Sequence, residues 1–280
     1  MKASQLLKKQ HRDVEKLFAT ALKTEDPKGR GRAADEVKAH VEHHTDIEEH
    51  IFYPAVRELG TKKAEEMIGE AYEEHHVVKL VLAELPRVSP EDGRFEAVAT
   101  DLSDAAACRA VVAEAVRLGS GLDALCNVAG INRFHHFLEM PEADWHRILA
   151  VNLSAVAFLC QAALPQLIAR RGCIVNVASV AASKGQAYTV AYCASKGGLV
   201  QLTRGLAMEF VDQPVRINAV APGGIETAMN QNLSFPEGMD WKKVGRYSGP
   251  RKMAQPEEIA RVIAFLASDD ASNVHGAVWA

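Results

Sequence analysis

The sequence lacks an excess of positive charge. Lys and Arg number 32 against 36 Asp and Glu, which gives a formal net charge of -4. Such a chain offers no basic field to a nucleic-acid backbone, and no cluster of Lys and Arg suggests an anionic membrane surface. We therefore expect small-molecule partners and no nucleic acid.

Long apolar runs are also lacking. Residues 1–15 alternate charged and apolar side chains, so they do not predict a secretory signal. The longest apolar stretch, 155–169, is interrupted by Gln161, Pro165 and Gln166 and is shorter than a membrane span. We expect a cytoplasmic protein with no membrane partner.

Cysteine is scarce, and its five copies show neither the paired spacing of a metal site nor an even number for disulfides. Their apolar contexts predict buried free thiols. These cysteines are Cys108, Cys126, Cys160, Cys173 and Cys193.

The amino-acid composition differs between the two ends of the chain. Seven of the eleven histidines lie in the first 76 residues, whereas Gly, Ala and Val are rich after residue 97. Residues 3–23, 33–59 and 62–85 have the apolar period of amphipathic helices, and two prolines with Gly93 predict a linker over 86–93. We therefore predict an all-α domain over 1–94 and a second domain over 95–280.

Each predicted N-terminal helix places one histidine on its apolar stripe. These are His11, His44 and His75, and Glu48 follows His44 by one turn. A buried imidazole or carboxylate costs a few kcal/mol unless it is paired or bound. Three helices that aim such groups at one another predict a metal site. The alternative is that these groups cap helices, pair with glutamates or face water.

At Gln10–Arg12, His44–Pro54 and Glu74–Lys79 the chain resembles a hemerythrin-type HHE cation-binding domain. The resemblance implies iron ligands at the three histidines and the glutamate above, within a bundle of four helices. No fourth histidine-bearing helix follows, so the bundle and its ligand set would be partial. A substitute fourth helix could be formed by Phe95, Val98, Leu102, Ala106 and Val112.

After residue 95, strand-like runs alternate with helices. The runs cover 96–100, 122–128, 173–177, 215–220 and 276–279. This alternation predicts βαβ units and a parallel sheet, that is, an α/β fold.

A phenol and an ammonium lie four residues apart on one helical face, at Tyr192 and Lys196. The lysine charge is expected to lower the tyrosine pKa, because an unperturbed tyrosine is a poor base at neutral pH. Ser179 lies thirteen residues upstream, at the end of an apolar strand, where an open α/β sheet presents its ligands. A tyrosine and a lysine at this spacing can also be plain surface neighbours, so the combination with Ser179 carries the prediction.

Several short motifs follow one another in order: Asp101-Leu102, Asn127–Gly130, Val151–Leu153, Ser179, Tyr192 with Lys196, and Pro222–Ile225 with Thr227. At these residues the chain resembles the short-chain dehydrogenase/reductase superfamily, whose fold is a doubly wound, Rossmann-type parallel sheet. The resemblance implies NAD or NADP as cofactor and a carbonyl or alcohol as substrate.

The resemblance also implies roles for these residues. Tyr192 would exchange a proton with the substrate oxygen, Ser179 would hydrogen-bond that oxygen, Lys196 would hold the nicotinamide ribose, and Asn152 would support a water chain. Further cofactor contacts are implied at Asp101, Asn127, Ala129, Gly130, Pro222, Gly223, Ile225 and Thr227. In each case a structural role is the alternative: Asp101 as a cap near Ser103, Asn127 as a tie between strands, and the glycines as turns.

One family element is missing from this sequence. Short-chain dehydrogenases begin with a strand and a TGxxxGxG turn that holds the cofactor pyrophosphate. No glycine before Gly93 has that spacing or follows a predicted strand. We therefore expect a partial sheet with an exposed edge and a weakened nucleotide site.

Substrate selection and assembly are assigned by the same resemblance. The loop 226–249, with Phe235, Met239 and Trp241, would form an apolar lid. Apolar faces of the helices over 145–168 and 191–211 would form a dimer or tetramer interface. Two functional alternatives remain beside the enzyme: an iron- or oxygen-binding module, and a non-functional fusion of two partial domains.

Overall fold

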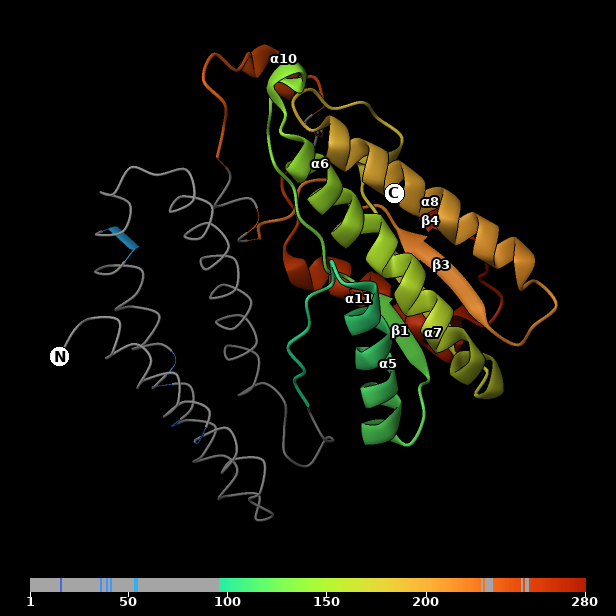
Figure 1. The fold of residues 1–280 in the computed structure, drawn as a ribbon. Coiled ribbons are helices and arrows are strands. Elements are labelled where there is room, and N and C mark those ends of the chain that lie inside the picture. Colours follow the sequence, from blue (N-terminus) through green and yellow to red (C-terminus); the bar gives the residue numbers. More distant parts are fainter. Residues whose placement is uncertain are drawn as a thin grey trace. The chain divides into compact units, whose positions relative to one another are not determined.

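The computed structural model describes residues 96–227, 229, 234–247, 249 and 252–280, and six single positions nearer the N-terminus (Figure 1). By its internal contacts the chain divides into two units, Met1–Glu96 and Ala97–Ala280. The predicted ligands His11, His44, Glu48 and His75 lie outside the described residues, as do Phe95 and the predicted linker over 86–93. The six single positions are helical, as predicted for their ranges: Lys16, Glu36, Ala39, Val41, Tyr53 and Pro54.

The second unit is built on a parallel sheet of four strands in the order β1-β2-β3-β4. The strands are β1 (Ala124–Asn127), β2 (Cys173–Val177), β3 (Arg216–Val220) and β4 (Val278–Trp279). All three pairings are parallel, and four of the predicted strand-like runs are thereby confirmed. The central strands β2 and β3 are buried along almost their whole length, as expected of strands covered on both faces.

Helices cover both faces of this sheet (Figure 1). Ile174 and Ile217 pack with α5 (Ala105–Gly119), α7 (Ala155–Ala169) and α8 (Val190–Glu209) on one face. Val175 and Val220 point the other way and pack against α11 (Pro256–Ala267). The predicted α/β fold with a doubly wound sheet is confirmed, because neighbouring residues of one strand serve different helical layers.

Helix α11 is fixed to the sheet by a charged side chain as well as by apolar contacts. The guanidinium of Arg216 on β3 donates to the carbonyl of Leu266 at 2.7 Å and to that of Ser268 at 3.0 Å. These carbonyls belong to the end of the helix, where no intrahelical donor remains. Arg216 therefore caps α11 from the sheet.

Among the described residues, one helical stretch is long and apolar enough to cross a membrane by length and composition alone. It covers Glu142–Ala169 and combines α6 (Glu142–Leu149), a π-helical turn (Ala150–Ser154) and α7. The expectation that no such stretch exists was therefore wrong, because it considered only the part after residue 155. Half of the apolar window is buried within the fold, where α7 packs on α5 and the sheet.

The segment 96–100 is not a strand, contrary to prediction. It is irregular, with Val98 exposed at 45%, and β1 pairs only with β2 among the described strands. A strand needs a hydrogen-bonding neighbour, and none of the described residues pairs with this segment. Among the described strands, β1 is therefore the edge next to this segment.

The substitute fourth helix is also wrong as proposed. Residues 96–104 are not helical, and α5 begins only after Asp104, whose carboxylate accepts from the Ala106 amide at 2.8 Å. Cys108 and Val112 on α5 are buried in the core shared with α7. Their apolar side chains belong to the core of the α/β domain.

The cysteines are free thiols, but two of the five are not buried as predicted. Cys108, Cys160 and Cys173 are buried, and burial raises the pKa of Cys160 to about 12. Cys126 is exposed because it lies on the edge strand β1, and Cys193 is only partly covered on α8.

A tight turn joins α7 to β2 through Gly172. Its amide donates to the carbonyl of Leu167 at 2.7 Å, and a Cβ atom at this position would overlap the carbonyl oxygen of Asp123. Only glycine fits such a close approach of two backbone segments.

Candidate active site

The predicted catalytic residues meet at the carboxyl end of β2. Ser179 follows β2 by two residues, Tyr192 and Lys196 lie on the first turns of α8, and Asn152 lies in the π-helical turn. The carboxyl ends of parallel strands are where open α/β sheets hold ligands. The structure therefore brings together the four side chains that the sequence predicts.

Ser179 and Tyr192 interact directly. The Ser179 hydroxyl lies within hydrogen-bonding reach of the Tyr192 phenol, and it accepts from the Ala181 amide at 3.1 Å. Burial raises the pKa of Tyr192, while the bond from Ser179 acts in the lowering direction. The phenol is thus a protonated donor at neutral pH, already in contact with the hydroxyl that would share its substrate oxygen.

Lys196 is buried, with 3% of its surface exposed, and its Nζ donates to the Val177 carbonyl at 2.7 Å. Burial lowers the pKa of Lys196 to about 8. Nζ lies 5.8 Å from the centre of the Tyr192 ring. The prediction that this charge lowers the tyrosine pKa was wrong for this structure, because the ammonium faces a backbone carbonyl and desolvation of the phenol dominates.

Asn152 links two segments of the site. Its Oδ1 accepts from the Ile131 amide at 2.8 Å, and its Nδ2 donates to the Ile131 carbonyl at 2.8 Å and to the Ser195 hydroxyl at 3.1 Å. Ser195 in turn donates to the Tyr192 carbonyl at 2.8 Å. The amide thereby fixes the chain after β1 to the first turns of α8.

The π-helical turn gives Asn152 this position. A π-turn contains one more residue than an α-turn and occurs often at functional sites. Asn152 is fully buried within it, and every polar atom of its side chain has a partner. Its predicted support of a water chain stays a prediction, while its anchoring of Ile131 is observed.

Gly130 leaves room beside the lysine. A Cβ atom at this position would lie 3.3 Å from Asn152 Oδ1 and 3.4 Å from Lys196 Nζ. The missing side chain therefore keeps open the space into which the ammonium projects. Ala129, the preceding residue of this motif, is exposed at the same end of β1.

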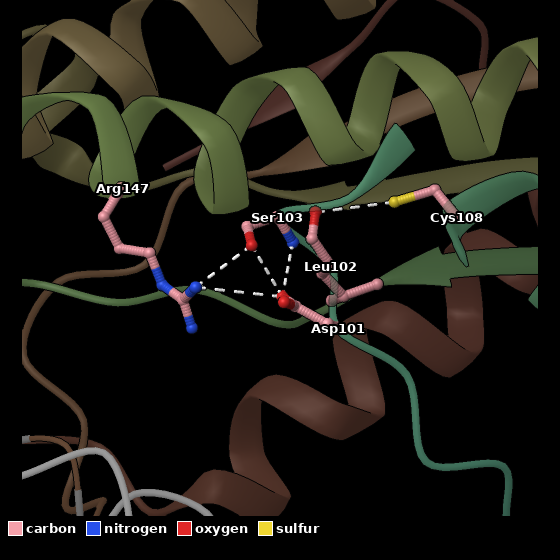
Figure 2. Close-up of polar contacts among 5 residues, drawn as sticks. All are labelled: Asp101, Leu102, Ser103, Cys108 and Arg147. Carbon is pink, nitrogen blue, oxygen red and sulfur yellow. Dashed lines mark hydrogen bonds and ion pairs between the residues drawn. The ribbon is translucent and has the colours of Figure 1, made fainter. Parts of the chain in front are cut away.

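Asp101 takes the structural role considered as its alternative. Figure 2 shows Ser103 and Arg147 converging on its carboxylate. The Ser103 amide and hydroxyl donate to Oδ1 at 2.9 and 2.7 Å, and an Arg147 nitrogen lies 3.8 Å away. The hydrogen bonds from Ser103 hold the pKa of Asp101 below its usual value. Its contact with an adenine stays a prediction.

Asn127 likewise ties strands together. Its Nδ2 donates to Asn176 Oδ1 at 2.8 Å across the β1–β2 pair, and Asn176 Nδ2 donates to the Thr203 hydroxyl on α8 at 3.0 Å. All three side chains are buried. This polar chain crosses the core from the edge strand to the helix that carries Tyr192.

The segment after β3 lies beside the serine turn. The Val180 amide donates to the Pro222 carbonyl at 2.9 Å, and Ile225 forms a bridge with Ala254. Gly223 is exposed at this edge and Thr227 is partly exposed. The structure thus places Pro222 beside the turn that follows Ser179, and the cofactor contacts of this segment stay predictions.

The predicted apolar lid has an aromatic cluster on its described part. Phe235 meets Phe134 with ring centres 5.1 Å apart and Trp241 with ring centres 5.0 Å apart, and Met239 is buried. The short helix α10 (Trp241–Gly245) belongs to this part of the loop. Among the described residues there is no group of three or more His, Cys, Asp or Glu that could hold a metal ion.

Comparison with protein families decides the ancestry of the larger part of the chain. A family model described as enoyl-(acyl carrier protein) reductase matches residues 74–280. The chain belongs to the short-chain dehydrogenase/reductase family. It is therefore an oxidoreductase of that type. A second model, the hemerythrin HHE cation binding domain, matches residues 2–114, so the two matches overlap.

Individual relatives agree with this assignment. Meso-2,3-butanediol dehydrogenase of Serratia marcescens is 40% identical over 200 residues, which cover 71% of this chain and 76% of that protein. The 3-oxoacyl-(acyl-carrier-protein) reductase of Thermotoga maritima is 38% identical over 187 residues, or 66% and 75% of the two chains. A solved short-chain alcohol dehydrogenase from Sinorhizobium meliloti 1021 superposes with a TM-score of 0.63 at 34% identity, covering 74% of this chain and 80% of that one.

Two residues of this short-chain dehydrogenase site were missed by sequence reasoning. Ser195 is fully buried and carries the bond from Asn152 to Tyr192, although it lies inside the very motif that was recognised. Tyr188 has a positive φ of 69°, a conformation that no sequence pattern predicts for a tyrosine. Both depend on contacts with residues distant in the sequence, so residue type alone gives no signal for them.

Proposed function

We propose that this chain transfers hydride between NAD or NADP and a small carbonyl or alcohol substrate. The observation that carries the proposal is the contact of Ser179 with Tyr192, beside the buried ammonium of Lys196. A phenol, a hydroxyl and a cation at one sheet edge are suited to passing a proton to a carbonyl oxygen.

The described side chains divide this work among them. Tyr192 holds the transferable proton on its phenol oxygen, and Ser179 orients the oxygen that receives it. Lys196 has one described hydrogen bond, to Val177, and its ammonium can donate three. Its remaining donors fit ribose hydroxyls in the space left by Gly130. The nicotinamide, when bound, supplies the hydride.

The nicotinamide end of the cofactor fits these residues better than the pyrophosphate end does. No TGxxxGxG turn precedes the domain, so the usual backbone donors for the phosphates are missing from this sequence. Each charge-assisted hydrogen bond contributes about 1.5–3 kcal/mol, so losing two weakens binding roughly 100- to 10,000-fold. We therefore propose an impaired enzyme with weak nucleotide affinity.

Titration of the purified chain with NADH and with NADPH, followed by nicotinamide fluorescence, tests this proposal. We expect weak saturable binding and slow turnover of small ketones or alcohols, abolished by Tyr192→Phe because the phenol proton is then missing. Cys193→Ser is the matched control on the neighbouring residue and should keep the turnover. Equal turnover in the Tyr192→Phe variant would show that the phenol is not used.

A second function is supported by the hemerythrin match over residues 2–114. We propose that His11, His44, Glu48 and His75 bind iron, with the ligand set partial as the sequence predicts. Metal analysis after anaerobic iron loading, with the absorbance of an oxo-bridged di-iron centre, tests it. Less than about a tenth of an equivalent of iron would refute metal binding. Failure of both the iron and the nucleotide test would leave a non-functional fusion.

Assembly and location are further proposals. We expect a homo-oligomer that buries the outer faces of α7 and α8, since Met208 on α8 is 74% exposed and Val211 just beyond it is 56% exposed. Light scattering should report a dimer or tetramer that Met208→Glu weakens. We further expect the protein in the cytoplasm, without membrane or nucleic-acid partners, as its charge pattern suggests.

A further inference from the structure

Tyr188 has an unusual backbone conformation at an important place. Three described residues other than glycine have positive φ: Ser120, Arg171 and Tyr188. The first two lie just past the ends of α5 and α7, where left-handed residues commonly terminate helices. Tyr188 instead precedes α8 by two residues, with φ 69°. A strained residue of this kind persists only when its surroundings hold it.

Three contacts hold Tyr188. Its carbonyl accepts from the His135 amide at 2.8 Å, and its ring meets that of His136 edge-on, with centres 5.3 Å apart. Its phenol oxygen accepts from the Asp240 amide at 2.9 Å. Asp240 is the capping residue at the start of α10. The third contact therefore depends on the docking of residues 234–247, which we call the lid segment.

The lid segment is attached to the same place by two further hydrogen bonds. The Tyr247 hydroxyl donates to the Ala187 carbonyl at 3.2 Å, and His136 Nε2 lies 2.8 Å from the Glu237 carbonyl. These hydrogen bonds join the lid segment to Tyr188, to the residue before it and to the His136 ring that meets it edge-on. The docked lid segment therefore favours the strained conformation.

The strained residue leads directly into the catalytic turn. Thr189 caps α8 without a side-chain hydrogen bond, and its carbonyl accepts from the Cys193 amide at 2.9 Å in the first turn. Tyr192 lies within this turn. Relaxation of Tyr188 to negative φ would rotate the peptide before Thr189 and move that turn.

We propose that Tyr188 is a positioning residue that couples docking of the lid segment to the placement of Tyr192. The bond between Asp240 and the Tyr188 phenol is the link. When the segment undocks, Tyr188 loses one of its three supports, and the first turn of α8 loosens with it. The catalytic meaning of this coupling rests on the proposed function of Tyr192, whereas the coupling itself does not.

Hydrogen exchange of the full chain tests the coupling with two variants and their combination. Phe235→Ala removes the aromatic contacts of the lid segment without touching Tyr188 or Ala187. Tyr188→Phe removes only the phenol oxygen and keeps the ring. We expect Phe235→Ala to speed exchange of the lid amides and of the Cys193 amide together, about fivefold, the factor for one net hydrogen bond. Amides in the second half of α8 are the internal reference and should not change.

The combined variant decides whether Tyr188 is the link. With Tyr188→Phe already in place, adding Phe235→Ala should speed exchange of the lid amides but leave the Cys193 amide unchanged. An unchanged Cys193 amide in the single Phe235→Ala variant would overturn the coupling. A further rise at Cys193 in the combined variant would show that the coupling does not pass through the phenol. Exchange needs no turnover, so an inactive enzyme would not affect the result.

Discussion

Because Lys196 is buried, we expect the free energy of unfolding to depend on pH. The substitution Lys196→Met should remove this dependence. Burial lowers the pKa of Lys196 from 10.5 to about 8. The difference between these values, at about 1.36 kcal/mol per pKa unit, amounts to roughly 3 kcal/mol of lost stability while the group is charged. Lys196→Met removes the charge and keeps most of the side-chain volume.

The direction follows from proton counting. Between pH 8 and 10.5 the unfolded chain keeps the lysine proton while the folded chain releases it, so the free energy of unfolding rises with pH in this window. Below pH 8 Lys196 is charged in both the folded and the unfolded chain, so the full loss of stability is present. Above pH 10.5 Lys196 is neutral in both, and the loss of stability is absent. Burial raises the pKa of Tyr192 and of Cys160, and these groups act in the opposite direction at high pH. The variant keeps both, so the difference between the two proteins isolates the lysine.

Urea unfolding of both proteins at several pH values measures this difference. We expect the wild type to gain about 2.5 kcal/mol relative to Lys196→Met between pH 7 and pH 10. Loss of the hydrogen bond to Val177 in the variant adds an offset that does not vary with pH. A difference that stays constant over this range would refute the argument that the ammonium is desolvated.

Three other substitutions test the packing of the α/β domain. Gly172→Ala should cost about 1–3 kcal/mol in urea unfolding, because its Cβ overlaps the Asp123 carbonyl, whereas Gly185→Ala, with open space around it, should cost little. Arg216→Met should lower the free energy of unfolding by about 1–3 kcal/mol and raise exchange at the end of α11, because two carbonyls lose their donor. Asn176→Leu takes one buried hydrogen-bond partner from the Asn127 amide and one from the Thr203 hydroxyl, so thermal unfolding should show a loss of about 2–4 kcal/mol.

The fold was largely predictable where one interaction dominates. Strands β2 and β3 are mainly apolar, and this pattern favours burial on both faces of the sheet. The segment 96–100 has the same local pattern and is not a strand, because pairing depends on a neighbour that sequence propensity does not include. The edge position of β1 among the described strands and the exposure of Cys126 follow from the same lack of a described neighbour.

The sequence predicted which residues form the site but not their pKa values. The motifs correctly predicted that Ser179, Tyr192 and Lys196 lie together. The expected effect of the lysine on the tyrosine pKa failed, because spacing along a helix says nothing about where the ammonium points or how dry the phenol is. The sequence could not predict the backbone strain at Tyr188, because contacts with residues distant in the sequence impose it.

The π-helical turn at Ala150–Ser154 also limits how this site can vary. The one extra residue in this turn rotates the side chains of the helix after it by about 100° relative to those before it. Substitutions at Asn152 can change the chemistry of the amide but not its direction. Deleting one of the other residues of this turn would restore the regular helix and turn the Asn152 side chain away from Ile131. The direction of the Asn152 side chain therefore depends on the number of residues in the turn. Insertions and deletions in this helix should be rarer among active relatives than substitutions.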